Sequence, residues 1–332
     1  MRIKYTITGL LLCLSITTQA QNYLKLTSLY GEWKFTIGDN KEWAKTEYND
    51  SKWEQIKVPS AWEDQGFNGY DGFAWYRKKF TVSQDYKNEQ LYLNLGYIDD
   101  CDEVYINGSL IGFTGSMPPR FSTAYNSFRI YFIPKEIISF DKPNTLAVRV
   151  YDSHLAGGIV NGDVSIAMQN NPYPLLINLY GLWKFIPKDN SEFRKPDILT
   201  NNWSNITVPK PWEDQGYQNY DGFGWYSKRF YVSGDYSNER LVVVLGKIDD
   251  FEEVYLNGEY IGPLKKISES QHGATRYNQF RAYYISGKLL KANQYNIISV
   301  RVLDTGGVGG IYEGPVGISK QSDYVQYWKN RR

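Results

Sequence analysis

Two copies of one aromatic and acidic loop carry the residue types best suited to bind a sugar. The first copy, VPSAWEDQGFNGYDGFAWYRKKF, spans Val58 to Phe80, and the second, VPKPWEDQGYQNYDGFGWYSKRF, spans Val208 to Phe230. Tryptophan and tyrosine rings offer flat apolar faces to the C–H side of a sugar, and carboxylates accept hydrogen bonds from its hydroxyls. The carbohydrate-binding residues predicted here are Trp62, Glu63, Asp64, Tyr70 and Asp71, with Trp212, Glu213, Asp214, Tyr220 and Asp221 in the second copy.

The same loop also permits a purely structural interpretation. In it, Trp62 and Trp212 close one end of the fold, and the acids accept hydrogen bonds from loop amides. Agreement between the copies does not separate the two interpretations, because both copies share one fold. Trp75 and Trp225 lie on the strand that follows, and we expect them in a core rather than against a ligand.

Asp152 and Asp304 are further candidates, because each ends a strand pattern and precedes a glycine-rich loop. The loops read AGGIVNGDVSI and VGGIYEGPVGI. A carboxylate beside such a loop can contribute to a carbohydrate site. A plain turn is the alternative.

Two acidic runs, IDDCDEVY and IDDFEEVY, place four acids within five residues. Ca²⁺ accepts oxygen ligands at such a density. However, neighbours on a strand point to opposite faces, and the spacing is not that of an EF-hand. The pattern favours solvated acids or acids paired with arginine, with Arg129, Arg149, Arg281 and Arg301 as candidate partners.

Catalysis has little support in the sequence. No serine stands in a nucleophile elbow, and no set of cysteines and histidines has metal-ligand spacing. We therefore expect a non-catalytic protein with no cofactor, a structural Ca²⁺ being the one ion left open. A cryptic glycoside hydrolase is the alternative, since that chemistry needs only two acids about 5–10 Å apart.

The elements that carry these residues are predicted to be strands. Trp33 and Phe35 alternate with polar residues, and the turns Asn107-Gly108 and Asn257-Gly258 each separate two apolar runs, as in a β-hairpin. The runs NTLAVRVYD and NIISVRVLD indicate half-buried strands. Strands recurring with turn signals predict an all-β chain of two tandem antiparallel β-sandwiches, most simply jelly rolls.

The chain is predicted to divide into a signal peptide and two repeated domains. The first residues combine Arg2 and Lys4 with an apolar run and a small residue, Ala20, at the expected cleavage point, which predicts a secreted or periplasmic protein. We expect no lipid anchor on Cys13. The predicted segments are 1–20 for the signal peptide, 21–171 and 172–320 for the jelly-roll domains, and 321–332 for a C-terminal tail.

Composition excludes some partners. The formal net charge is +1, which favours neither nucleic acid nor an anionic membrane surface, and no later segment is apolar enough to span a membrane. After cleavage Cys101 is the one remaining cysteine. Its counterpart is Phe251, so we expect a buried apolar site there.

The order of motifs resembles one known kind of domain. VP..W, YDG.AWYRK.F, LG.IDD.DEVY.NG..IG, N.LAVRVYD and GGI together resemble the galactose-binding-like jelly roll attached to glycoside hydrolase family 2 enzymes, such as beta-galactosidases, and to bacterial sialate O-acetylesterases. The resemblance covers nearly all of both copies. It implies an accessory domain whose enzyme chemistry lies elsewhere, and domains of this type often hold a structural Ca²⁺.

These observations lead to one main hypothesis and two alternatives. The main hypothesis is an exported, non-catalytic protein that binds a glycan or polysaccharide and serves polysaccharide utilisation. The first alternative is a structural or assembly partner of a separate glycoside hydrolase. The second is the cryptic glycoside hydrolase.

Overall fold

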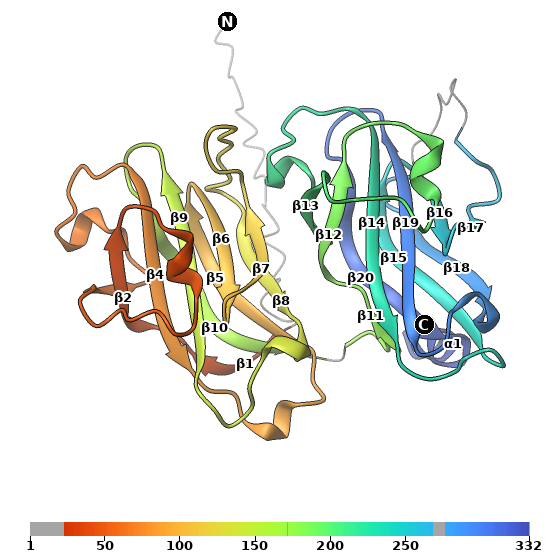
Figure 1. The fold of residues 1–332 in the computed structure, drawn as a ribbon, viewed down its shortest axis with the longest axis horizontal. Coiled ribbons are helices and arrows are strands. Elements are labelled where there is room, and N and C mark those ends of the chain that lie inside the picture. The colour runs from red at the N-terminus through yellow and green to blue at the C-terminus, as the bar shows by residue number, and fades with distance from the viewer. Residues whose placement is uncertain (1–22, 171, 268–275, 332) are drawn as a thin grey trace, which may run out of the picture.

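A computed structural model describes residues 23–170, 172–267 and 276–331, which form two halves side by side (Figure 1). The predicted signal peptide, 1–20, lies outside the described residues. Every strand ladder in the two halves is antiparallel, which confirms the all-β prediction. No helix within the described ranges is long and apolar enough to cross a membrane.

The first half contains a four-stranded and a six-stranded sheet. The four-stranded sheet has the order β1 (Tyr23–Ser28), β10 (Gly158–Gln169), β5 (Leu91–Asp99) and β8 (Phe128–Ile133). The six-stranded sheet has the order β3 (Glu54–Val58), β2 (Gly31–Ile37), β4 (Gly72–Phe80), β9 (Asn144–Asp152), β6 (Cys101–Ile106) and β7 (Ser109–Thr114).

The second half repeats this arrangement. Its four-stranded sheet has the order β11 (Ile177–Asn178), β20 (Gly310–Lys320), β15 (Arg240–Asp249) and β18 (Phe280–Ser286). Its six-stranded sheet has the order β13 (Ser204–Val208), β12 (Gly181–Ile186), β14 (Gly222–Val232), β19 (Gln294–Asp304), β16 (Phe251–Leu256) and β17 (Glu259–Gly262).

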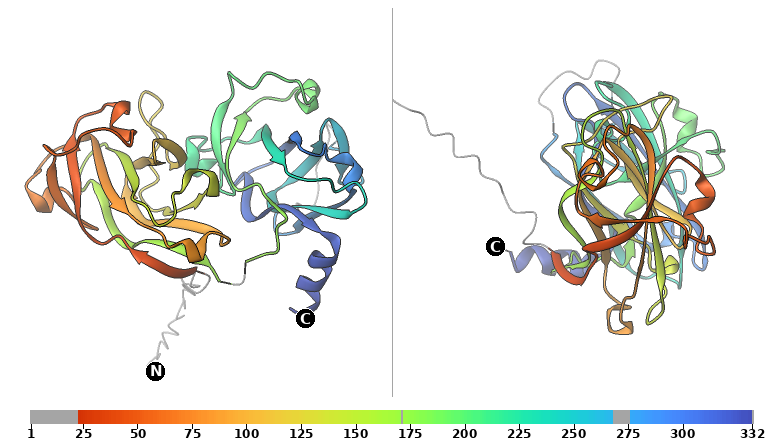
Figure 2. Two further views of the ribbon diagram at one scale, coloured as in Figure 1. Left: turned by 60° about the horizontal axis from the view of Figure 1, so that its bottom comes forward. Right: turned by 90° about the vertical axis from the view of Figure 1, so that its left-hand side faces the viewer.

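Short 3-10 turns connect some strands, and one α-helix follows the last strand. The turns are Lys41–Ala44, Glu63–Gln65, Gln84–Tyr86 and Lys135–Ile137 in the first half, and Ser191–Arg194, Glu213–Gln215 and Gly287–Leu289 in the second. The helix α1 (Gln321–Lys329) occupies the predicted C-terminal tail and projects from the second half (Figure 2). Its Tyr327 packs edge-on against Tyr173, with ring centroids 4.5 Å apart.

Each half packs as two layers because both of its sheets line one hydrophobic cluster. In the first half, Leu93 of β5 and Val148 of β9 belong to the same cluster. Val243 of β15 and Val300 of β19 do so in the second. The alternating apolar residues predicted to face a core therefore do so.

The prediction that the VRV strands are half-buried is wrong for β9, whereas in β19 the outer-face residues Ile297, Arg301 and Leu303 are only partly buried, as predicted. Ala147 and Arg149 of β9, on the face opposite Val148, are also buried. That outer face is covered by a separate cluster in which Trp75 stacks on Tyr105, with ring centroids 5.7 Å apart. Alternation of apolar and polar residues predicts that one face of a strand is buried, and it cannot show that surface loops cover the other face.

The predicted Asn-Gly turns have the required backbone. Asn107 and Gly108 have φ of 50° and 81°, and Asn257 and Gly258 have φ of 52° and 86°. Positive φ at both positions is the requirement of the tight hairpin turn for which Asn-Gly is favoured.

The second copy of the aromatic and acidic loop contacts the first half. Lys210 Nζ donates to Thr114 Oγ1 and lies 5.3 Å from the centre of the Tyr131 ring, and Gly115 N donates to Asp214 O at 2.6 Å. The Lys210 residue is only 8 % exposed. One copy of the loop is thus part of the contact between the halves.

Candidate functional site

The tryptophans of the two loops are buried. Trp62 and Trp212 are both 0 % exposed and belong to the hydrophobic clusters between the sheets. The prediction that their rings offer a flat face to a sugar is therefore wrong for this structure. Trp75 and Trp225 are buried as expected, although in the clusters on the outer faces of the six-stranded sheets.

The glutamates of the loops bind backbone amides. Glu63 Oε2 accepts a hydrogen bond from Gly157 N at 3.0 Å, and Glu213 accepts one from Gly309 N at 3.0 Å. These contacts join each aromatic and acidic loop to the glycine-rich loop of the same half. They agree with the structural interpretation of the acids, and burial raises the pKa of Glu213 to about 7.

The tyrosines and aspartates of the loops have mixed surroundings. The hydroxyls of Tyr70 and Tyr220 donate to the carbonyl oxygens of Phe73 and Phe223 at 2.7 and 2.8 Å, and both rings pack edge-on against the loop tryptophan. The loop aspartates that are exposed to solvent are Asp64, Asp71 and Asp221, whereas Asp214 is half-buried. These aspartates remain available for hydrogen bonds to a ligand.

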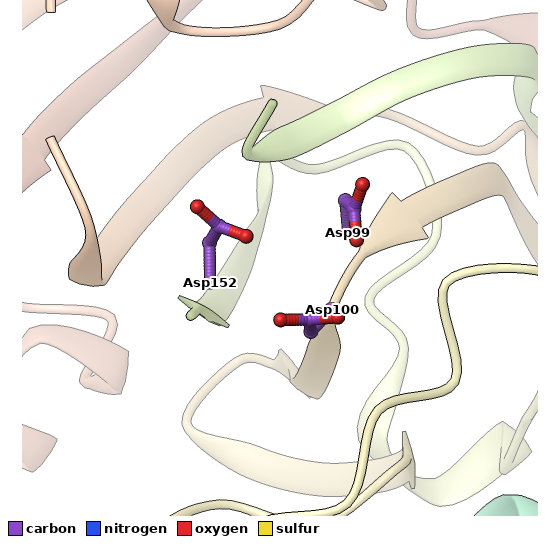
Figure 3. A group of neighbouring side chains, drawn as sticks. All are labelled: Asp99, Asp100 and Asp152. Carbon is purple, nitrogen blue, oxygen red and sulfur yellow. The ribbon is translucent and has the colours of Figure 1, made fainter. Parts of the chain in front are cut away.

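Asp152 and Asp304 each join two further aspartates. Asp99 and Asp100 lie opposite Asp152 (Figure 3), and one oxygen from each carboxylate lies within 4.8 Å of the others. The second half has the same cluster, formed by Asp249, Asp250 and Asp304. We call these two groups the three-aspartate clusters.

Hydrogen bonds distinguish the members of the first cluster. Asp100 Oδ2 accepts from Ser153 N at 3.0 Å and from Ser153 Oγ at 2.7 Å, and Asp100 Oδ1 accepts from Thr123 Oγ1. In contrast, neither oxygen of Asp152 has a hydrogen-bond partner within the described part of the chain, although this residue is 0 % exposed. The cluster thus contains one satisfied and one unsatisfied buried carboxylate.

These surroundings shift the pKa values of Asp152 and Asp100 in opposite directions. Burial, with the neighbouring charges of Asp100 and Asp99, raises the pKa of Asp152 to about 7. Burial also opposes ionisation of Asp100, but the hydrogen bonds from Thr123 and Ser153 outweigh it and lower the pKa of this group. In the second half, burial raises the pKa of Asp304 to about 6 and also raises that of Asp249.

The remaining acids of the two runs pair with arginine, as predicted. Arg129 Nε donates to Asp102 Oδ1 at 2.9 Å, and Arg281 Nε donates to Glu252 Oε2 at 2.8 Å. Arg149 and Arg301 pair with Glu103 and Glu253 on the other face. Asp100 and Asp250 differ from the expectation of solvated or arginine-paired acids, because both are buried and no ion pair among the described residues includes them. Cys101, which lies between Asp100 and Asp102 in the first run, is buried as expected.

A cavity of about 490 Å³ lies beside the cluster of the second half. The Tyr312 hydroxyl donates to Tyr277 O at 2.8 Å, and the Tyr277 side chain is 53 % exposed. The cavity combines carboxylates, a glycine-rich loop and two aromatic rings, and is lined by Asp249, Asp250, Tyr277, Thr305, Gly306, Gly307, Val308 and Tyr312.

The predicted carbohydrate-binding residues did not include Asp99, Asp249, Tyr277 or Tyr312. For the two aspartates, the sequence did offer a signal, which is the Asp-Asp pair repeated at the end of a strand. In the structure Asp99 ends β5, opposite Gly158 in the β5–β10 ladder. Which strand ends meet across the two sheets is a property of the packing. Nothing in the sequence distinguishes Tyr277 and Tyr312 from the other tyrosines.

The curated relatives of this chain are carbohydrate-active enzymes, of which it spans a small part. A beta-glucuronidase of Formosa agariphila is 25 % identical over 191 residues, which are 54 % of this chain and 17 % of the relative. A second protein of that species, provisionally named a beta-glucuronidase, is 34 % identical over 136 residues, 37 % of this chain and 12 % of the relative. The beta-galactosidase BoGH2A of Bacteroides ovatus is 28 % identical over 131 residues, 36 % of this chain and 14 % of the relative.

A beta-glucuronidase is also among the similar solved structures. The Bacteroides uniformis beta-glucuronidase 2 bound to a cyclophellitol aziridine matches with a TM-score of 0.39 and 21 % identity, over 88 % of this chain and 28 % of that chain. No protein-family model matches the chain. The curated relatives agree with a carbohydrate-related domain, which is the coarser part of the predicted resemblance.

Proposed function

We propose that this chain is an exported, non-catalytic carbohydrate-binding protein made of two jelly rolls of the galactose-binding-like type. Its curated relatives are named beta-glucuronidases and a beta-galactosidase, and the chain spans between 12 and 17 % of the length of the three relatives described above. That share is the size of an accessory region, in line with the resemblance to the accessory domain of family 2 enzymes.

The observation that carries the proposal is the cavity beside Asp249 and Asp304. Tyr277 and Tyr312 provide aromatic surface at its edge, and the carboxylates provide hydrogen-bond acceptors within it. An aromatic face beside convergent acceptors is the usual arrangement for a sugar, whose ring has one apolar face and a rim of hydroxyls. The second half is therefore the proposed binding half.

The charge of the cavity selects among sugars. Asp249 and Asp250 line it and Asp304 adjoins it, so a carboxylated sugar would add a fourth carboxyl group to three that already disfavour one another's ionisation. We propose neutral sugars, such as galactosides, as the ligand class, with uronic acids disfavoured.

Calorimetric titration of the full chain tests this proposal. Neutral oligosaccharides should release heat, uronic acid oligosaccharides should bind more weakly, and Tyr312→Val, which installs the residue of the first half at position 160, should weaken the neutral ligand. The absence of heat from every glycan in a broad panel would falsify the proposal. Unchanged affinity in the variant would move the site away from this cavity.

Export is a separate part of the proposal. It is supported by the basic, apolar and small residues of the first twenty positions. Expression of the full chain in a bacterium, followed by N-terminal sequencing, should give a mature protein that begins at Gln21. An unprocessed chain retained in the cytoplasm would contradict this part.

An assembly role is a second candidate, favoured by a separate apolar groove of about 750 Å³ on the second half. Leu264 is fully exposed in its rim, and Tyr284 is 59 % exposed. Apolar side chains gathered in this way on a surface are typical of a protein contact.

If the groove docks a glycoside hydrolase, Leu264→Asp should abolish co-sedimentation with a beta-galactosidase catalytic region, while glycan binding at the Tyr277 cavity persists. Co-sedimentation unaffected by this substitution would exclude the groove as the contact.

A further inference from the structure

The contact between the two halves joins two different faces of the repeated domain. The first half contributes β7 and β8, which we call the receiving face, and the second contributes β12, β13 and the turn Glu213–Gln215, which we call the docking face (Figure 1). Lys210 reaches Thr114 across this contact, and Tyr180 packs against Phe132 with ring centroids 5.9 Å apart. Because β7 and β13 lie at opposite edges of the repeated six-stranded sheet, the contact is head-to-tail.

The second half has a receiving face of its own, and this face is exposed. β17 and β18 correspond to β7 and β8, and they lie on the side of the second half that faces away from the first (Figure 1). Tyr284, the counterpart of Phe132, is 59 % exposed, and Leu264, the counterpart of Thr114, is fully exposed. Both line the apolar groove of about 750 Å³. The surface that packs against a neighbour in the first half is thus open to solvent in the second.

The first half likewise has an exposed docking face, formed by β2, β3 and the turn Glu63–Gln65. Tyr30 on this face corresponds to Tyr180 and is 45 % exposed. A Cβ atom added at Gly216 would lie 2.8 Å from the Ser116 Cβ of the other half, whereas one added at the counterpart Gly66 would meet no described atom within 4 Å. Each chain therefore presents one free receiving face and one free docking face.

The polar pair of the internal contact is replaced as a pair on the two free faces. Lys210 donates to Thr114 within the chain, and the counterparts of these residues are Ser60 and Leu264. A lysine opposite Leu264 would lose its hydrogen-bond acceptor on burial, and the short serine avoids this cost. The free docking face therefore suits the apolar groove better than a copy of the internal one would.

Charge also favours a contact between the two free faces. Gly115 N donates to Asp214 O at 2.6 Å across the internal contact. The counterparts of these residues are Lys265 and Asp64, and both are exposed. A lysine of one face would thus meet an aspartate of the other, and opposite charges in register guide the docking of two surfaces.

We propose that the groove of one chain binds the free docking face of a second copy of this chain. Tyr284 of one chain packs against Tyr30 of the other, in the place that Phe132 and Tyr180 take within the chain. Because two different faces meet, further copies add at either end, into a ring or an open filament. The inference rests on the assembly role proposed for this groove, and it does not depend on the glycan cavity.

Sedimentation velocity of the purified protein, from micromolar to near-millimolar concentration, tests the proposal. The unmodified protein should sediment faster as its concentration rises, through dimers to longer species. Tyr284→Asp and Tyr30→Asp should each raise the concentration needed for half-association about tenfold or more. Tyr295→Asp changes a similarly exposed tyrosine outside both faces and should associate like the unmodified protein. A monomer at every concentration, or association unchanged in either face variant, would overturn the proposal.

Mixing the two face variants tests whether the contact is head-to-tail. The Tyr284→Asp chain keeps its docking face and the Tyr30→Asp chain keeps its receiving face, so the mixture has one intact contact. It should form a dimer that grows no further. A mixture that stays monomeric, or one that forms longer species, would contradict the proposal.

Two further measurements separate the possible failures. Circular dichroism should show both variants folded, because Tyr30 and Tyr284 lie on the surface, and Leu264→Asp replaces Tyr284→Asp should the latter fail to fold. A chain that stays monomeric but co-sediments with a beta-galactosidase catalytic region through Leu264 would overturn the contact between copies and leave the assembly role intact.

Discussion

The two copies of the aromatic and acidic loop have nearly the same sequence and conformation but different neighbours. Trp62 and Trp212 lie in equivalent cores, and each is followed by a 3-10 turn that ends at a left-handed glycine, Gly66 or Gly216. In the second half, however, Lys210 and Asp214 of this loop contact the first half. The repeated loop therefore has a structural role in both halves: its buried tryptophan, Trp62 or Trp212, closes one end of the core, and we call this residue the plug. The surroundings of each loop decide which surface is left for a ligand or a partner.

The largest expected effect tests whether the two plugs are equivalent. Trp62→Ala and Trp212→Ala should each lower the free energy of unfolding of their own half by about 3–5 kcal/mol, because each removes a fully buried indole. Chemical denaturation measured by fluorescence and circular dichroism gives both values. A loss below about 1 kcal/mol in either variant would mean that this ring is not part of the core.

Lys210, which is buried against the first half, should make the free energy of unfolding depend on pH in a way that the first loop does not. Burial lowers the pKa of Lys210 from 10.5 to about 8, so between these values the unfolded chain binds more protons at this site than the folded chain. The free energy of unfolding should therefore rise with pH across this window, by an amount on the order of 3 kcal/mol for full burial. Lys210→Met should remove this part of the rise, measured by denaturation between pH 7 and 10.5.

Two controls accompany that measurement. Lys228, whose pKa burial also lowers to about 8, should keep its own contribution in the Lys210→Met variant. Ser60→Lys, at the equivalent and half-exposed position of the first half, should add no rise of its own, since solvent reaches that loop. A pH profile unchanged by Lys210→Met would show that the lysine is not buried between the halves.

A smaller effect tests the contact between the plug and the glycine-rich loop. A Cβ atom at Gly157 would lie 2.1 Å from Trp62 Cζ2, and one at Gly309 would lie 1.9 Å from Trp212 Cε2. Gly157→Ala and Gly309→Ala should each destabilise by about 1–3 kcal/mol through overpacking. Adding Trp62→Phe to Gly157→Ala should cost less than the sum of the two single changes, which a double-mutant cycle measures. Additive losses would show that the two positions do not touch.

The smallest expected effect concerns the ligand ends of the two halves. Tyr277 borders the cavity of the second half, where Tyr312 is its partner, and the matching residues of the first half are Tyr125 and Val160. Tyr277→Ala should weaken neutral sugar binding roughly 3- to 10-fold, whereas Tyr125→Ala should leave it unchanged. Titration of both variants with one oligosaccharide decides this, and equal losses would place binding in both halves.

Much of the fold followed from local patterns. The strands around Trp33 and Phe35, the Asn-Gly hairpins, and the pairing of Asp102 with Arg129 are confirmed. The strands and the hairpins depend on neighbours along one strand or on the next strand of a sheet. Asp102 and Arg129, in contrast, lie on β6 and β8 of different sheets, so their pairing depends on how the two layers pack. The predicted sugar contacts of Trp62 and Trp212 failed because a large aromatic residue in a loop has the same sequence signature whether it faces solvent or a core.

By itself, then, the sequence determined the repeat, the strand pattern with its period of two and the turns that need positive φ, because these are fixed by local sterics and side-chain alternation. The tertiary structure alone decided which strand ends meet. Asp99 and Asp152 are far apart in the chain and lie in different sheets, and they converge only because the two layers pack face to face. The same holds for Lys210, whose burial depends on how the two halves contact each other, a relation between surfaces that no period along the chain encodes.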